Sequence, residues 1–516
     1  MELNSNSQSS DNKRIAKNTI YLYFRMLLTM IVGLYTSRVI LQILGIEDYG
    51  IYSAVGGVVG MLTFLNAALA TGSSRFLTYE LGRKDYERLR KMFSTLLSVH
   101  IILGFIIVFL CETIGLWLIS NKLIIPENRF DAALWCFHLS VFTCFVTVVQ
   151  VPYNATIISH EKMDIYAYVS IVDSCLKLAI VYLLLISPID KLIFYAILLM
   201  LVNAGVMFFY IWYCSRKYEE STYTLILDKP IIKEVLSYSA WNLLANIGVT
   251  LKNQGSVVLI NMFFNPAVVT AQTIANKVSL VADQFVNNFR TAANPQIVKK
   301  YAALDLQGSK SLMLASTKYS FYLVLLIGLP IILVAEPVLR LWLGQVPEYS
   351  VSFLRLIMVT SIVNVFNSSL YTAIYATGRV RDNAISGSII WLLVLPISYV
   401  FFRLGYSPVV IAIVTLVCNI LLSFVQKPIL LHRIVDYSWS EILFLYGICT
   451  KVTLIAVPIP VITYLMKRSL FTNRIMESLF LVLISVSCVT VSVWIFGLDN
   501  EMRDKLMNYA KNKLNR

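Results

Sequence analysis

The sequence predicts an all-α polytopic membrane protein with about 14 transmembrane helices. Hydrophobic residues make up 58% of the 516 residues, charged residues make up 14%, and the mean hydropathy is +0.72. Apolar runs recur along the whole chain, and many approach the roughly 20 residues with which an α-helix crosses about 30 Å of hydrocarbon. A soluble protein could not bury so much apolar surface, so we expect these runs to face lipid.

The predicted spans follow one another between two polar, basic tails, residues 1–17 and 499–516. We place the spans at residues 18–43, 49–72, 93–119, 132–156, 165–186, 191–213, 236–263, 267–292, 313–335, 351–376, 384–403, 407–430, 442–465 and 475–497. The first tail lacks a small-residue cleavage site after an apolar stretch, so we interpret it as a cytoplasmic tail and not as a secretory signal peptide.

Membrane topology explains the net charge of +14. With these spans, about 27 of the 43 Lys and Arg residues fall on one side of the membrane and about eight on the other. This excess in alternating short loops is the positive-inside pattern, and it predicts that both termini are cytoplasmic. We therefore expect a multi-pass membrane protein that has no nucleic-acid partner.

Motifs for catalysis or for binding a cofactor are missing from the sequence. The eight cysteines form no C-x-x-C pair, and the four histidines lack the spacing of metal ligands. The loops are too short to house a soluble catalytic domain. We predict a protein that is not an enzyme, with no catalytic residue, no metal and no cofactor.

A weak internal repeat relates two halves of the chain at an offset of about 220 residues. Residues 69–95 have the same layout as residues 289–317, and residues 152–171 resemble residues 370–389. An even number of spans separates the copies, so a parallel repeat is predicted. The predicted domains are a tail (1–17), an N-terminal six-helix lobe (18–214), a linker between the lobes (215–235), a C-terminal six-helix lobe (236–431), extra helices 13 and 14 (432–498) and a basic tail (499–516).

Polar side chains line one face of the span predicted at 267–292. At 100° per residue, a single helical face comprises Gln272, Asn276, Ser279, Asp283, Asn287, Arg290 and Asn294. Asn265 and Pro266 predict the start of this helix, and Pro295 predicts its end. In span 236–263 a second polar face comprises Asn242, Asn246 and Asn253.

These polar faces must be turned away from lipid, because an amide in hydrocarbon loses its hydrogen bonds with water. One interpretation is that they form hydrogen bonds between helices, which are typically worth about 0.6 kcal/mol each. The other is that they line a water-filled cavity. A stripe that extends along a whole helix favours the cavity.

Cations within the spans suggest an anionic ligand for that cavity. Arg25 lies about two turns into the first span and Lys252 near the middle of the seventh, which are equivalent helices of the two halves. An Arg side chain binds diphosphate well because its planar fork donates two hydrogen bonds at once. The predicted substrate-binding residues are Arg25, Lys252, Asn242, Asn246, Asn253, Gln272, Asn276, Asp283, Asn287 and Arg290.

Asp173 and Lys177 are four residues apart in the fifth span, so their side chains can form an ion pair. This pair fits a structural contact and a functional switch equally well. The candidates for coupling transport to an ion, either H⁺ or Na⁺, are Asp173, Lys177 and Asp283.

Residues 37–85 resemble the polysaccharide transporter, or O-antigen flippase, family of the multidrug/oligosaccharidyl-lipid/polysaccharide flippase superfamily. The likeness rests on Arg38, on LGIEDYGIY at 44–52 and on SSRFLTYELGRKD at 73–85. It implies a V-shaped pair of lobes around a central cavity. Such a protein translocates a lipid-linked, undecaprenyl-diphosphate oligosaccharide across the bacterial cytoplasmic (inner) membrane by alternating access, for the synthesis of O-antigen, lipopolysaccharide or other surface polysaccharide.

The partners that this resemblance implies are lipid-linked oligosaccharide, membrane lipids, a coupling ion and polysaccharide polymerase machinery. A cation-coupled multidrug exporter of the same superfamily is the alternative, with Asp173 and Asp283 as its carboxylates. A membrane glycosyltransferase, ligase or polymerase would need a sizeable outer loop with catalytic residues, and the predicted outer loops are short.

Overall fold

A computed structural model describes residues 2–224, 226–470, 474–500, 502–504 and 507–508. Helices account for nearly all of them, and these residues contain no strand. The prediction of an all-α fold is confirmed. The chain divides into two compact units, residues 1–270 and 271–516, and each unit is described by itself.

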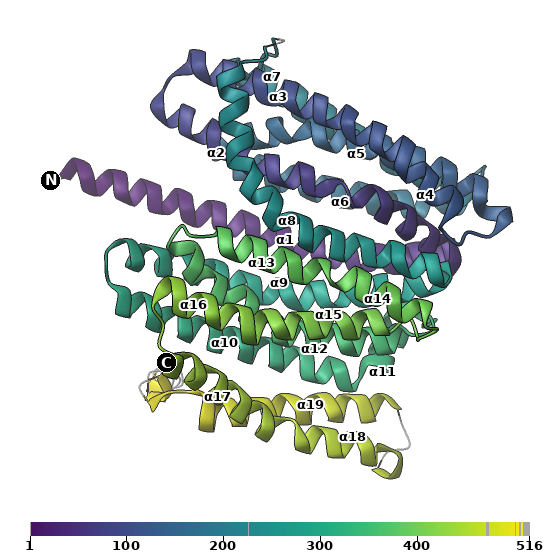
Figure 1. The fold of residues 1–516 in the computed structure, drawn as a ribbon, viewed down its shortest axis with the longest axis vertical. Coiled ribbons are helices and arrows are strands. Elements are labelled where there is room, and N and C mark those ends of the chain that lie inside the picture. The colour runs from purple at the N-terminus through teal and green to yellow at the C-terminus, as the bar shows by residue number, and fades with distance from the viewer. Residues whose placement is uncertain (1, 225, 471–473, 501, 505–506, 509–516) are drawn as a thin grey trace. The chain divides into compact units, whose positions relative to one another are not determined.

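Unit 1 contains eight complete α-helices and the start of a ninth at Pro266 (Figure 1). The complete helices are α1 (Glu2–Gly60), α2 (Thr63–Arg83), α3 (Tyr86–Leu110), α4 (Leu116–Asn121), α5 (Phe130–Ser159), α6 (Met163–Leu183), α7 (Lys191–Lys217) and α8 (Lys229–Phe263). A π-helical turn, Cys111–Gly115, joins α3 to α4, and short 3₁₀ turns occupy Glu127–Arg129, Leu184–Ile186 and Glu219–Ser221. Its two hydrophobic clusters are built mainly from α1, α2, α3, α5 and α7.

The segment LGIEDYGIY has a structural explanation in unit 1. Gly45 adopts φ 82° and breaks α1 at this point. A residue with a side chain would be strained in this backbone conformation. Gly50 lies so close to Pro266, which is still part of unit 1, that a Cβ atom there would fall 1.9 Å from the carbonyl oxygen of Pro266. Thr270 Oγ1 also donates to the carbonyl of Ile46 at 2.6 Å. The glycines of this segment therefore permit a turn and a close helix contact.

Arg129 ties three distant parts of unit 1 together. Its guanidinium donates to both carboxylate oxygens of Asp48, at 2.8 and 2.6 Å, and to those of Asp190, at 2.5 and 3.2 Å. Asp48 follows the break in α1, and Asp190 also caps α7 by accepting from the backbone N–H groups of Leu192 and Ile193. One cation thus compensates two acids whose side chains are mostly buried.

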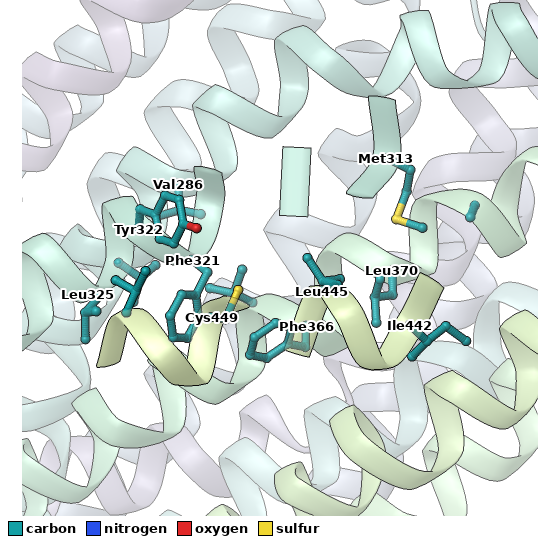
Figure 2. Close-up of a cluster of buried hydrophobic side chains, with 14 of the residues drawn as sticks. Val286, Met313, Phe321, Tyr322, Leu325, Phe366, Leu370, Ile442, Leu445 and Cys449 are labelled. Carbon is teal, nitrogen blue, oxygen red and sulfur yellow. The ribbon is translucent and has the colours of Figure 1, made fainter. Parts of the chain in front are cut away.

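Unit 2 comprises most of α9 and the helices that follow. They are α9 (Pro266–Ala302), α10 (Leu306–Leu333), α11 (Ala335–Leu343), α12 (Ser350–Ala376), α13 (Arg381–Leu392), α14 (Val394–Arg403), α15 (Val410–Leu421), α16 (Lys427–Val435), α17 (Trp439–Ala456), α18 (Pro458–Leu470) and α19 (Arg474–Ser492). Two π-helical turns, Leu422–Gln426 and Val493–Gly497, follow α15 and α19. Its core lies where α10, α12 and α17 meet, with Phe321, Phe366 and Leu445 packed together (Figure 2).

The positions of the predicted spans agree well with helices, but their number is not established. Each predicted span falls on one helix or on two consecutive ones. Among the described residues, eleven helices are long and apolar enough to cross a membrane by length and composition, and α2, α8 and α9 are too polar to be among them. The protein is a multi-pass membrane protein, and the count of fourteen stays a prediction.

The ends of α9 test two local predictions. Asn265 accepts a hydrogen bond from the backbone N–H of Val268 at 3.1 Å, so the predicted cap is confirmed. The predicted end at Pro295 is wrong, because the helix continues through this proline to Ala302. A proline costs a helix one backbone hydrogen bond, and a long helix with tertiary support tolerates that loss.

The predicted lobe boundary can be compared with the two compact units. The repeat places residue 236 at the start of the C-terminal lobe, whereas α8 belongs to unit 1, where it packs against α1 and α2. Contacts in one conformation and correspondence along the sequence are different criteria, so the predicted lobes stay a prediction.

Candidate functional site

Arg25 lies on α1 of unit 1 and is held against α6. Its Nη1 atom is 3.5 Å from Ser170 Oγ, and its guanidinium carbon lies 4.8 Å from the centre of the Tyr166 ring. Its buried Nε atom has no hydrogen-bond partner in the described part of the chain. Among the described residues no carboxylate forms an ion pair with it, so the cation is positioned by an aromatic face and a hydroxyl.

Asp173 and Lys177 form the ion pair that their spacing predicts, with Lys177 Nζ 2.8 Å from Asp173 Oδ2. Tyr166 and Ser170 are on the same face of α6 as this pair, within about 60° at 100° per residue. Arg25 from α1 and the pair on α6 therefore form one charged strip in unit 1. The strip contains two cations and one acid, so its net charge is positive.

Lys177 also lines a cavity of about 400 Å³ inside unit 1. Its polar lining includes Thr143 and Thr147 of α5 and Asn203 of α7. The three side chains donate to their own helices, to the carbonyls of Leu139, Cys144 and Leu199 at 2.7–2.8 Å. Their oxygen lone pairs are therefore left as acceptors, which suit an ammonium group, a water molecule or a small cation.

Sequence reasoning did not find this cavity. Thr143 and Thr147 are four residues apart on α5, so a small polar face was readable there. Nothing in the sequence showed that Asn203 of α7 and Lys177 of α6 would border the same space.

The predicted residues of α8 lie in the same unit as Arg25. Asn246 and Lys252 are half-buried, and Asn253 is exposed. The side chain of Asn242 lies outside the described residues. A Cβ atom on Gly60 of α1 would fall 2.9 Å from the side chain of Gln254, so α8 packs closely on α1 beside these residues.

In unit 2 the polar stripe of α9 meets α12. Ser279 Oγ is 2.8 Å from Ser361 Oγ, and both hydroxyls donate to Asp283 Oδ2 at 3.3 Å. Further along, Thr372 Oγ1 donates to Asn294 Oδ1 at 3.1 Å. These bonds are of the interhelical kind, the first of the two interpretations of the stripe.

Arg290 extends the same pattern. Its Nη2 donates to the carbonyl of Ser368 on α12, and its Nη1 to Asn287 Oδ1 at 3.3 Å. Gln272 is buried, and its Oε1 accepts no hydrogen bond from the described residues. Asn276 is half-buried and Asn287 is exposed.

These contacts define two groups among the predicted residues. Arg25, Asp173 and Lys177 share one strip in unit 1, and the residues of the α9 stripe line up beside α12 in unit 2. The bonds to α12 explain part of the stripe as helix packing. A role of the stripe in binding substrate stays a prediction.

Comparison with protein families agrees with the resemblance. Residues 15–301 match the family model described as "Polysaccharide biosynthesis protein", which is more than half of the chain. A search of curated proteins found no match.

Several solved structures have a similar fold. An inward-facing multidrug resistance MATE family transporter of the MOP superfamily has a TM-score of 0.66 at 16% identity, over 80% of this chain and 99% of that one. The lipid II flippase MurJ, in an inward closed conformation, has a TM-score of 0.65 at 13% identity, over 93% of this chain and 98% of that one. A third structure is a MOP superfamily transporter from Pyrococcus furiosus, for which a binding pocket of reverse polarity suggests a different function. It has a TM-score of 0.59 at 15% identity, over 83% of this chain and 97% of that one. At these identities the likeness is one of fold.

Proposed function

This chain belongs to the polysaccharide biosynthesis protein family, and from that premise we propose that it is a flippase for a lipid-linked oligosaccharide. The substrate is an undecaprenyl-diphosphate oligosaccharide that crosses a bacterial cytoplasmic membrane by alternating access, for the synthesis of O-antigen or another surface polysaccharide. Both termini are cytoplasmic, and the protein moves its substrate without acting as an enzyme. The fold shared with a lipid II flippase and with multidrug transporters supports a transport role.

Arg25 is the observation that carries this proposal. A charge within a membrane-spanning helix is costly, and such residues are usually functional. The described structure supplies Arg25 with a ring face and a hydroxyl but with no carboxylate. A diphosphate offers the bidentate acceptor that a guanidinium fork fits.

The other predicted residues take supporting roles. Lys252 adds a second cation for the diphosphate, and the amides of Asn242, Asn246, Asn253, Gln272, Asn276 and Asn287, with Asp283 and Arg290, meet hydroxyl groups of the glycan. Movement of H⁺ or Na⁺ drives the cycle through Asp173, Lys177 and Asp283. Polysaccharide polymerase machinery takes over the product.

The test is transport of fluorescently labelled lipid-linked glycan by the full chain in reconstituted vesicles. Arg25→Ala combined with Lys252→Ala should lower the transport rate at least tenfold. Arg340→Ala is the matched control, because the Arg340–Glu336 pair is largely exposed in the helix α11. Wild-type rates in the double variant would exclude the proposed role of the two cations.

The alternative is a cation-coupled multidrug exporter. The fold likeness to a multidrug resistance transporter and the carboxylates Asp173 and Asp283 favour it. It predicts drug resistance on expression that is lost in Asp173→Asn and Asp283→Asn. Transport of lipid-linked glycan with no drug resistance would eliminate this alternative.

A further inference from the structure

An apolar groove runs along α6 and α7 of unit 1. It has a volume of about 500 Å³ and extends from Tyr168 to Leu183 on α6, with Leu201, Gly205 and Phe209 among its residues on α7. At 1.5 Å per residue its α6 wall is about 22 Å long. Apart from the Tyr168 hydroxyl, the lining side chains are apolar.

The groove opens on a surface that faces lipid. Tyr168 and Leu201 are each more than half exposed, and the spans to which they belong have mean hydropathies of 2.2 and 2.4. A hydrocarbon chain is therefore the kind of ligand that such a groove accepts.

The groove begins beside the cation of the charged strip. Arg25 contacts Tyr166 and Ser170, the residues that flank Tyr168 and Val169 at one end of the groove. At 100° per residue the groove face of α6 lies about 100° from the face that carries Arg25, Asp173 and Lys177. An anionic group and an apolar chain can therefore bind within one helical turn of each other.

We propose that this groove holds the isoprenoid tail of the lipid-linked substrate while Arg25 holds its phosphate. The inference deepens the proposed function and rests on it, because that function brings an anionic lipid with a very long tail to Arg25. A groove of this length binds one segment of the tail and leaves the remainder in the bilayer. The tail then follows unit 1 through the transport cycle.

Gly205 allows the groove to be filled without crowding the protein. A Cβ atom added at Gly205 would meet no other atom within 4 Å, so Gly205→Phe projects its ring into open groove space. Gly447 on α17 is the matched control, since a Cβ atom there also meets nothing within 4 Å. Both substitutions replace a helical glycine, which removes a residue of low helix propensity.

The experiment uses a polyprenyl phosphate that carries a photoreactive diazirine on its tail. The full chain is reconstituted in vesicles of phosphatidylethanolamine and phosphatidylglycerol, irradiated and mapped by mass spectrometry. We expect α6 and α7 to be labelled. An excess of unlabelled polyprenyl phosphate should reduce this labelling by competition, and added phosphatidylglycerol should not. Gly205→Phe should lower this labelling at least fivefold, Arg25→Gln at least threefold, and Gly447→Phe should not change it.

Each other outcome decides against the groove. Labelling that survives Gly205→Phe, or that phosphatidylglycerol competes equally well, would mean that the groove is a general lipid surface. The two proposals can fail separately. A groove that is labelled as expected in a protein without glycan transport would refute the proposed flippase function, and transport that is intact in Gly205→Phe would refute the groove.

Discussion

The charged strip of α6 in unit 1 and the polar stripe of α9 in unit 2 satisfy their polar groups differently. On α9, Ser279, Asp283 and Arg290 bond to side chains and a carbonyl of α12. In the charged strip, Asp173 and Lys177 of α6 compensate each other, whereas Arg25 of α1 forms no ion pair with a carboxylate among the described residues. The polar stripe of α9 has more polar residues and is bonded more closely to a neighbouring helix. The charged strip of unit 1 has fewer polar residues, and it contains Arg25, the cation best placed to bind a ligand.

The number of polar residues on a helix face is therefore a poor guide to function. A buried polar group costs free energy unless it is hydrogen-bonded, so a long stripe must find many partners, and a neighbouring helix can supply them. A single cation without an acid partner is the rarer arrangement in a membrane helix. We expect the two faces to respond differently to mutation.

The largest expected effect concerns Arg129, a cation of unit 1 that forms ion pairs with two carboxylates. In Arg129→Ala, Asp48 and Asp190 would keep their negative charges without the cation between them. Breaking a mostly buried ion pair in this way costs about 3–5 kcal/mol of folding free energy. Thermal unfolding of the detergent-solubilised protein measures it, and Arg340→Ala, at an exposed pair, should change little. An unchanged melting temperature in Arg129→Ala would contradict the pairing.

Arg25→Gln tests the cation that has no ion pair among the described residues. Loss of two charge-assisted hydrogen bonds to phosphate should lower the affinity for polyprenyl diphosphate at least tenfold, because each is worth about 1.5–3 kcal/mol. Unfolding temperature should stay near the wild-type value, since the guanidinium contacts only a ring and a hydroxyl. Binding of a labelled polyprenyl diphosphate to the reconstituted protein gives the affinity. A variant that binds normally but unfolds early would make Arg25 a structural residue.

Arg290→Gln should lower the stability of the protein, whereas Arg25→Gln should not. Its guanidinium donates to the carbonyl of Ser368, so the substitution weakens the contact between α9 and α12. We expect a loss of about 1.5–3 kcal/mol in stability, the range for a hydrogen bond to a charged group. Thermal unfolding and transport, measured side by side with Arg25→Gln, decide whether the comparison holds. If Arg290→Gln abolishes transport at unchanged stability, the α9 stripe serves the substrate and not the packing.

The smallest effect concerns the linker after α7, which is held on unit 1 by His160 and Glu220. His160 Nε2 donates to Glu220 Oε1 at 2.5 Å. Burial raises the pKa of Glu220, and the hydrogen bonds from His160 and from a backbone N–H lower it by more, so its pKa lies below the usual 4.5. This stabilisation is therefore present above pH 4.5 and lost as the pH falls through the lower, folded-state pKa.

Glu220→Gln should remove this pH dependence. The variant is expected to lose about 1.5 kcal/mol at pH 7 and to approach the wild type in acid. Unfolding measured between pH 7 and pH 3 gives both curves. A constant difference between them over this range would show that Glu220 is not the titrating group.

Local features of this protein could be predicted from sequence because they depend on spacing within one helix. The Asp173–Lys177 pair and the cap at Asn265 involve residues three or four positions apart, where helical geometry determines the distance. The continuation of α9 through Pro295 could not be predicted in this way. A proline weakens a helix locally, and whether the helix ends there depends on tertiary contacts.

The membrane class, the order of the helices and the faces that bear polar groups followed from residue order alone, because hydropathy and helical periodicity are short-range properties. Three-dimensional folding settled which of those polar groups are satisfied. Ser361 and Ser368 lie about eighty residues beyond their partners on α9, and Asp48 lies about eighty residues before Arg129. Such contacts depend on how whole helices pack, and helical periodicity carries no information about which helices become neighbours.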